Sequence, residues 1–199
     1  VYATPLLGGI VSDRYLGQTH AVKLGGILLV LGHCAMAFEG VPASGTVGGD
    51  VVRDQEAIKV FYFALALIVV GVGLLKPNIS TVVGRLYKDD DPRRDGGFTI
   101  FYMGINVGAA SAALLCGWLA SAYGWSYGFG AAGIGMLIGL VIFSAGQDWL
   151  QGQGDPANPA LLNAPASASF GLLSVQNTIY LLSLAAVFIV WIMLQTPGG

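Results

Sequence analysis

The chain has 199 residues and a net charge of −2; only 10% of its residues are charged, 55% are hydrophobic and 30 are glycine. A soluble domain carries about 25% charged residues and about 7% glycine, so this composition excludes an ordinary soluble protein and indicates an integral membrane chain. The small negative charge gives no sign of nucleic-acid binding.

Apolar runs in the first half of the chain predict one short helix and two full membrane spans. The short helix occupies residues 1–12 and is expected to end at Asp13-Arg14. The second helix is predicted over residues 22–38 and the third over 57–87. The third contains Pro77, which is expected to bend this helix rather than to end it.

The second half of the chain predicts three more spans. Residues 96–147 contain no charged side chain, and such a run holds two crossings of about 20 residues each. We expect these spans at 97–120 and 129–144, then a linker rich in Pro, Ala and Gly, and a last span at 177–194. The predicted fold class is all-α, a polytopic helical bundle in a membrane.

The basic residues predict which ends of the spans face the cytoplasm. They gather after the first span and around the turn after the third, at Arg14, Lys23, Arg85, Lys88, Arg93 and Arg94. By the positive-inside rule, both of these loops are cytoplasmic. The linker that begins at Gln147 should then be cytoplasmic too, although it contains no Lys or Arg.

Lys76 is the most informative single residue, because it follows sixteen uncharged residues. An ammonium group at the middle of a bilayer costs roughly 2.5 to 3.5 kcal/mol, so some function should compensate for it. The alternatives are a structural ion pair and a side chain that extends along a tilted helix toward water. Pro77 beside it favours a broken helix that lines a cavity.

Three polar residues are predicted at the same depth as one another. Tyr2, Lys76 and Asn106 each lie eleven residues from the cytoplasmic end of their helix, about 16 Å along the axis and near the middle of a core about 30 Å thick. Tyr102 shares a helix face with Asn106. These groups predict a polar cavity for a ligand with a carboxylate and amide bonds, although Tyr2 and Asn106 are also compatible with helix packing.

The sequence offers no convincing catalytic set. Cys34 and Cys116 lie on separate predicted spans and His33 has no evident catalytic partner, so we expect neither a metal site nor an enzyme. The paired glycines at 104 and 108, and at 135 and 139, have the spacing that lets membrane helices approach closely. We therefore interpret both pairs as packing positions.

Four segments of the first 143 residues resemble the proton-dependent oligopeptide transporter family of the major facilitator superfamily. They occur in the expected order and at the expected spacing: Gly8-Gly-Ile-Val-Ser-Asp-Arg-Tyr-Leu-Gly17, Gly71-Val-Gly-Leu-Leu-Lys-Pro-Asn78, Arg94-Asp-Gly-Gly-Phe-Thr-Ile-Phe-Tyr-Met-Gly-Ile-Asn-Val-Gly108 and Gly124-Trp-Ser-Tyr-Gly-Phe129. The resemblance implies a symporter of di- and tripeptides in the cell membrane that works by alternating access and is driven by a proton gradient without a cofactor. The expected partners are small peptides, protons and the lipid bilayer.

The resemblance also implies a domain organisation. Residues 1–146 would be part of the N-terminal bundle of the major facilitator superfamily, its second to sixth helices, and residues 147–175 a cytoplasmic linker. Residues 176–199 would be a further transmembrane helix, either one inserted between the two bundles or the first helix of the second bundle. The first helix and the C-terminal bundle, which would complete the carrier, are not among these segments.

Residue roles follow from the resemblance position by position. Tyr2, Lys76, Tyr102 and Asn106 match residues that line the peptide cavity, and Asp13 and Arg14 match the cytoplasmic gating motif. The family usually places basic residues after the glycine at position 17, whereas this chain has Gln18, Thr19 and His20, so a weaker gating charge network is expected. The alternative functions are a carrier of nitrate or another small solute in the same family, and a membrane subunit that does not transport.

Overall fold

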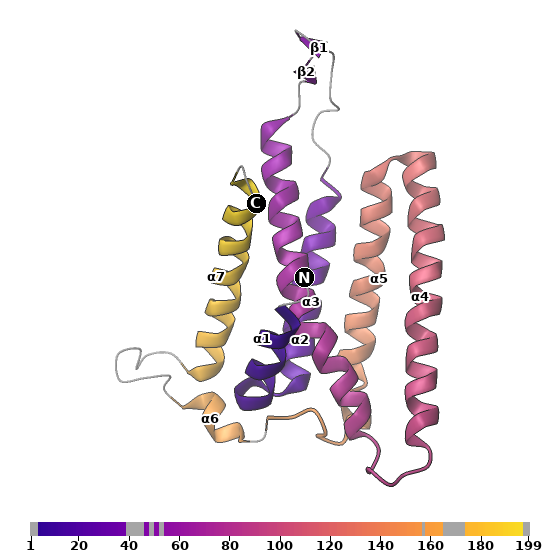
Figure 1. Ribbon diagram of the computed structural model, residues 1–199, viewed down its shortest axis with the longest axis vertical. Coiled ribbons are helices and arrows are strands. Elements are labelled where there is room, and N and C mark those ends of the chain that lie inside the picture. Colours follow the sequence, from indigo (N-terminus) through magenta and orange to yellow (C-terminus); the bar gives the residue numbers. More distant parts are fainter. Residues whose placement is uncertain are drawn as a thin grey trace.

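The computed structural model describes residues 4–38, 46–47, 50–51, 54–156, 158–164 and 174–196, and these are almost entirely helical (Figure 1). The elements in chain order are α1 (Thr4–Val11), the π-helical turn η1 (Ser12–Leu16), α2 (Gln18–Met36), β1 (Thr46–Val47), β2 (Asp50–Val51), α3 (Gln55–Arg85), α4 (Arg94–Tyr123), α5 (Trp125–Ala145), the 3₁₀ turn η2 (Gln147–Leu150), α6 (Pro159–Asn163) and α7 (Val175–Gln195). The two short strands pair in an antiparallel hairpin between α2 and α3.

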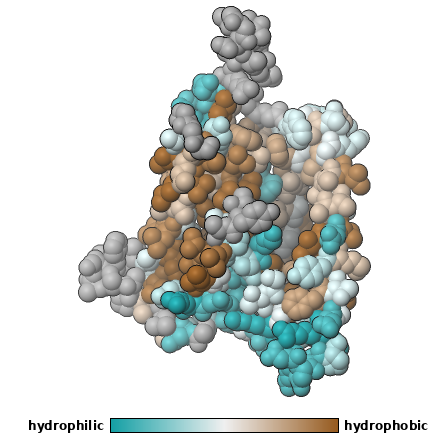
Figure 2. All heavy atoms as spheres, viewed as in Figure 1, coloured by the Kyte–Doolittle hydropathy of each residue, from teal (hydrophilic) through white to brown (hydrophobic). Residues whose placement is uncertain are grey.

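The long helices pack side by side in the order α4, α5, α2, α3, α7, and α1 lies against α3 (Figure 1). Five helices, α2, α3, α4, α5 and α7, are long and apolar enough to cross a membrane. With 31 and 30 residues, α3 and α4 are each about 45 Å long and exceed a hydrocarbon core of about 30 Å. Figure 2 shows hydrophobic residues over the middle of the molecule and hydrophilic residues gathered at one end.

The predicted spans are all present, but several ends differ. The first helix does not stop at Asp13: the chain stays helical through η1 and turns at Gly17, whose φ of 74° suits a glycine and whose N–H donates to Ser12 O at 2.8 Å. Gly124, with φ of 109°, is the one residue between α4 and α5. The predicted fifth span therefore begins at Trp125 rather than at residue 129, because a single glycine suffices for this reversal.

Part of the segment expected to be a linker packs on the bundle. Residues 147–150 form η2 and residues 159–163 form α6. Leu162 is buried in a cluster with Leu16 of η1 and Ile179 of α7. The described parts of the chain between α5 and α7 therefore lie at the end of the bundle that carries η1.

The hydrophobic core lies where α2, α3 and α7 meet. Its buried members include Leu28 from α2, Leu67 and Val70 from α3, and Val187 from α7. Trp191 of α7 also donates its Nε1–H to Lys59 O at 3.0 Å, which ties α7 to the start of α3. By contrast, α4 has no buried residue. One side of the bundle is therefore open along α4.

The close helix contacts occur at glycines other than those predicted. A Cβ on Gly25 of α2 would lie 2.7 Å from Gly71 O of α3, so the two backbones touch here. A Cβ at the predicted packing glycines 104, 108, 135 or 139 would meet nothing within 4 Å in the described part of the chain. The spacing of glycines predicted the kind of contact but not the helix pairs that make it.

This difference gives a test of the α2–α3 contact. Gly25→Ala should destabilise the chain by about 1 to 3 kcal/mol, because the atoms that crowd the new methyl group belong to the backbone and cannot rotate away. Gly139→Ala on α5 is the matched control and should be neutral, or stabilising by up to about 1 kcal/mol. Thermal unfolding in detergent, followed by circular dichroism, measures both; equal midpoints for the two variants would contradict the packing described.

Candidate functional site

Pro77 opens the hydrogen-bond ladder of α3 at the point where α1 packs against it. α3 continues through this residue, but proline has no N–H to donate to the carbonyl four residues earlier, which is that of Gly73. The Gly73 oxygen lies against Gly8 of α1, so close that a Cβ on Gly8 would overlap it. Ser80 and Thr81 each donate a side-chain hydroxyl to Pro77 O at 3.0 Å, which stabilises the turn after the proline.

Asn78 connects this part of α3 to α1 and η1. Its side chain is 1% exposed. The Nδ2 group donates to Leu74 O at 2.6 Å within α3 and to Gly8 O of α1 at 3.5 Å. The Oδ1 atom accepts from the hydroxyl of Ser12, the first residue of η1. A buried amide with partners on both of its ends therefore holds the two segments together.

The predicted gating residues lie on η1, next to that amide. Asp13 follows Ser12 directly, and its Oδ1 accepts a hydrogen bond of 2.7 Å from Nε2 of Gln18, the first residue of α2. Arg14 is exposed, and within the described residues it makes no ion pair. The structure thus gives Asp13 a neutral partner that sequence reasoning did not assign to it.

The predicted cavity residues lie on α3 and α4. Lys76 is exposed on α3, directly before Pro77. Tyr102 on α4 is 55% exposed, and Asn106 one turn further donates to Tyr102 O at 2.8 Å. No hydrogen bond links Lys76 to either of them in the ranges that the structure describes, and Tyr2 lies outside those ranges. The contact between Tyr102 and Asn106 is thus internal to α4, and Lys76 lies on a separate helix.

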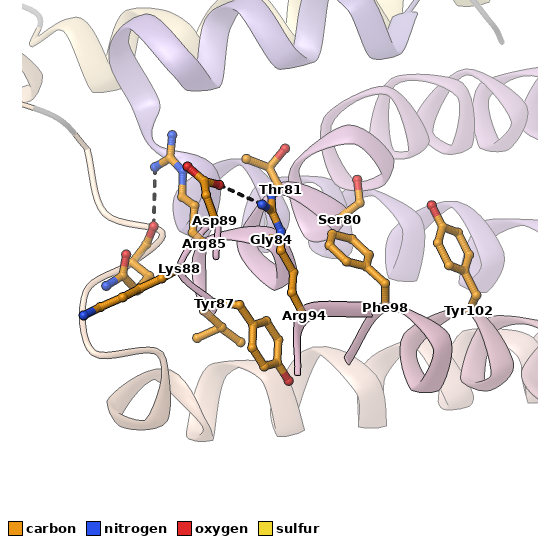
Figure 3. A pocket seen from close by; sticks show the side chains of 12 residues that line it. Ser80, Thr81, Gly84, Arg85, Tyr87, Lys88, Asp89, Arg94, Phe98 and Tyr102 are labelled. Atoms are coloured by element: carbon orange, nitrogen blue, oxygen red, sulfur yellow. Dashed lines mark hydrogen bonds and ion pairs between the residues drawn. The ribbon is translucent and has the colours of Figure 1, made fainter. Parts of the chain in front are cut away.

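A polar cleft of about 810 Å³ separates the last turns of α3 from the start of α4 (Figure 3). Ser80, Thr81 and Gly84 form its α3 side, while Phe98 and Tyr102 form its α4 side, with ring centroids 6.4 Å apart. Lys76 precedes Ser80 by four residues and so lies one turn further along the same helix face. Lys76 on α3 and Asn106 on α4 therefore each lie one helical turn from a residue that lines the cleft, on the side away from the charged end of the bundle.

Basic side chains surround the mouth of this cleft. Arg94 pairs with Asp89 at 2.7 Å, and Arg85 donates to Gln153 O at 3.4 Å (Figure 3). In the adjoining turn, hydrogen bonds from the Arg93 side chain and backbone lower the pKa of Asp91 to about 2, so this carboxylate stays ionised and neutralises Arg93. Lys88, which also lines the cleft, has no ion pair among the described residues.

Sequence reasoning missed the two amides that organise the site, Asn78 and Gln18. Asn78 lies in one of the segments that carry the family resemblance. Its polarity within an apolar helix could also have indicated a buried hydrogen-bonding role. Gln18 stood out only because the related family usually has basic residues after the glycine at position 17. Asn78 could not be paired with Ser12 in advance, because 66 positions separate them in the chain. Gln18 meets Asp13 only because η1 and the turn at Gly17 bring the two side chains together.

The buried amide predicts a specific stability difference between two asparagines. Asn78→Ala should cost about 1 to 3 kcal/mol, because it removes the buried hydrogen bonds that connect α3 to Gly8 O of α1 and to the Ser12 hydroxyl of η1. Asn106→Ala is the control and should change the free energy of unfolding by less than about 0.5 kcal/mol, since this exposed amide bonds only to its own helix. Unfolding midpoints in detergent compare the two; an equal loss in both would contradict a connecting role for Asn78.

Comparison with known proteins agrees with this architecture. The chain matches the model of the POT family over residues 19–179. It is 48% identical over 143 residues to the peptide transporter YePEPT of Yersinia enterocolitica, a match that covers 72% of this chain and 25% of that protein.

Two solved structures extend the likeness to the fold. A peptide transporter mutant in complex with alafosfalin is 36% identical, with a TM-score of 0.68, and the match covers 98% of this chain and 35% of that one. A bacterial homologue of the human drug peptide transporters is 26% identical, with a TM-score of 0.73, and the match covers 98% of this chain and 38% of that one.

The chain spans about a quarter of the length of the curated relatives that it matches. The family match covers 161 of the 199 residues, from position 19 to position 179, and so includes α2 to α5 and the beginning of α7. Together with five apolar helices of membrane-spanning length, these findings identify the chain as an integral membrane protein that belongs to the POT family of transporters.

Proposed function

We propose that this chain is part of a proton-coupled symporter of di- and tripeptides that works by alternating access. Its family and its similarity to peptide transporters support this function. Residues 1–146 form part of the first bundle, residues 147–175 a cytoplasmic linker and residues 176–199 a further membrane helix. The carrier uses a proton gradient instead of a cofactor and carries out no chemical reaction on the peptide.

The observation that carries this proposal is the position of Lys76. Its ammonium group belongs to an apolar helix, has no ion pair among the described residues and lies one turn beyond a polar cleft. A cation in such a place is expensive unless an anion meets it. A peptide carboxylate or a coupling carboxylate provides that anion, and Tyr102 and Asn106 on the facing helix provide polar contacts for the remainder of the peptide. Tyr2 belongs to the same proposed cavity.

Asp13 and Arg14 are proposed to form the cytoplasmic gate. Asp13 joins η1 to the start of α2, and η1 is fixed to α3 through Ser12 and Asn78. A carboxylate at such a junction stabilises one arrangement of the helix ends more than another. Alternating access requires such a difference in stability between two states.

Lys76 gives the strongest test in the full-length transporter. Lys76→Ala should reduce uptake to background while the protein still inserts, because removing an unpaired charge from a membrane helix does not by itself destabilise it. Lys76→Arg should also fail, since a broad guanidinium does not replace a compact ammonium. Uptake of a labelled dipeptide under an inward proton gradient, normalised to surface expression, measures the effect.

Lys59→Ala is the matched control for Lys76, because Lys59 lies near the other end of the same helix in an exposed pair with Glu56. Exposed pairs contribute about 0 to 1 kcal/mol, so uptake should remain normal. Normal uptake by Lys76→Ala at normal expression would return Lys76 to a structural role.

Tyr102→Phe and Asn106→Ala should act differently from Lys76→Ala. Each removes one polar contact to the peptide, so the peptide Kd should rise about two- to tenfold while uptake persists at saturating peptide. Equilibrium binding of a labelled dipeptide to the purified transporter measures this change. An unchanged Kd in both variants would remove these residues from the proposed cavity.

Asp13→Asn should change the balance between the inward- and outward-open states more than it changes the affinity for peptide. Asparagine keeps the size of the side chain but loses the charge that strengthens the bond from Gln18. The measurement is the rate at which a thiol reagent added from the cytoplasmic side modifies Ser80→Cys in the cleft, in a background without Cys34 and Cys116. An unchanged modification rate together with an unchanged transport rate would argue against the gate.

A further inference from the structure

Gln18 is a buried amide that holds the gating carboxylate. Its residue is 1% exposed, yet Asp13, to which it donates a 2.7 Å hydrogen bond, is exposed. A carboxylate oxygen only accepts hydrogen bonds, so the nitrogen end of the amide must face Asp13. This interaction fixes the orientation of the whole side chain.

Among the residues that the structure describes, the other end of this amide has no partner. Oε1 of Gln18 is buried and accepts no hydrogen bond from the described residues. A buried acceptor without a donor loses the solvation that it has in water. Burial of this amide is therefore less favourable than burial of an amide with both ends paired.

A strap formed by residues 147–156 contacts Thr19, the residue that follows Gln18. The strap accepts a hydrogen bond of 2.9 Å from Thr19 N at Gly154 O, and Arg85 of α3 donates to Gln153 O. Gly154 is so close to Thr19 that a Cβ there would overlap Thr19 Oγ1. The strap thus joins the first turn of α2 to the last turn of α3, directly beside Gln18.

We infer that Gln18 is the positioning residue of the gate: its neutral amide, held by the 147–156 strap, sets how strongly Asp13 stabilises one of the two states. This inference rests on the proposed alternating-access function and adds Gln18 and the strap to it. A lysine at this position would donate with a full charge and would leave no buried acceptor behind. A methionine of similar length would not donate at all.

The two substitutions should move the gate in opposite directions in the full-length transporter. We expect Gln18→Lys and Gln18→Met to shift the cytoplasmic modification rate of Ser80→Cys to opposite sides of the Gln18 value, each by about two- to tenfold, the range for one hydrogen bond. Shifts in the same direction, or no shift in either variant that folds, would overturn the inference. Peptide Kd, measured in parallel, should stay unchanged.

A double-mutant comparison separates positioning from general structural damage. In the Asp13→Asn background, both Gln18 substitutions should lose most of their effect on the modification rate, because the charge through which they act is absent. Effects of full size in that background would show that Gln18 acts by another route and would contradict the inference.

The strap has its own variant, which leaves Gln18 and Asp13 unaltered. Gly154→Ala should displace the strap from Thr19 and shift the modification rate in the same direction as Gln18→Met. Gly96→Ala, where a Cβ meets nothing within 4 Å, is the control and should cause no shift. An unshifted rate in Gly154→Ala at normal expression would exclude the strap from the gate.

These outcomes also separate the inference from the function on which it rests. If the transporter takes up no dipeptide but the modification rates shift as expected, peptide transport is wrong and the role of Gln18 stands. If uptake is normal and the rates do not move, the role of Gln18 is wrong and peptide transport stands.

Discussion

The contact of α1 and η1 with the proline-bearing stretch of α3 positions Lys76 on α3 and Asp13 on η1. Pro77 leaves the Gly73 carbonyl without its usual helical donor, and Gly8 lets α1 approach that carbonyl closely. Asn78 secures the same junction through Ser12 and Gly8 O. Lys76 lies two residues from Asn78, and Asp13 follows Ser12 directly. The same contact therefore fixes both the cation on α3 and the proposed gating carboxylate on η1.

Because of this contact, η1 and the Lys76 stretch of α3 cannot move independently of each other. If η1 moves relative to α3, the hydrogen bond between Ser12 and Asn78 must break, or α3 must move with η1. Either change affects the part of α3 that contains Lys76. The proposed alternating-access function needs such a connection, because a gate that moved independently of the proposed peptide cavity would not be coupled to it. The buried amide at position 78 is a compact way to provide it.

The ends of the helices carry most of the remaining polar chemistry. At the end that the positive-inside rule predicts to be cytoplasmic, the strap lies beside the cleft and its arginines (Figure 3). Most of the contacts there are single hydrogen bonds or exposed ion pairs, each of small net value. The middle of the bundle is held by apolar packing around Val187 and by close glycine contacts such as that of Gly25 with Gly71. Helix ends held this weakly are suited to rearrangement, whereas the packed middle is suited to move as a unit.

The sequence by itself determined the membrane spans, because a bilayer requires helices of about 20 apolar residues that satisfy their own backbone hydrogen bonds. It also selected Lys76, whose charge is isolated, and the Tyr102–Asn106 pair, whose spacing of four residues alone places them on one helix face. The helix ends near Gly17 and Gly124 were predicted less accurately, because a single glycine with positive φ determines where each turn occurs.

Only the tertiary structure decided which residues meet across helices. It paired Asp13 with Gln18, joined Ser12 to Asn78, and placed close backbone contacts at Gly8 and Gly25 instead of at the predicted glycines 104, 108, 135 and 139. Local periodicity shows which face of a helix is polar, apolar or small, but it does not identify the helix on the other side. That neighbour is chosen by how all the helices pack together, and for this reason the partners of the site residues could not be read from the sequence.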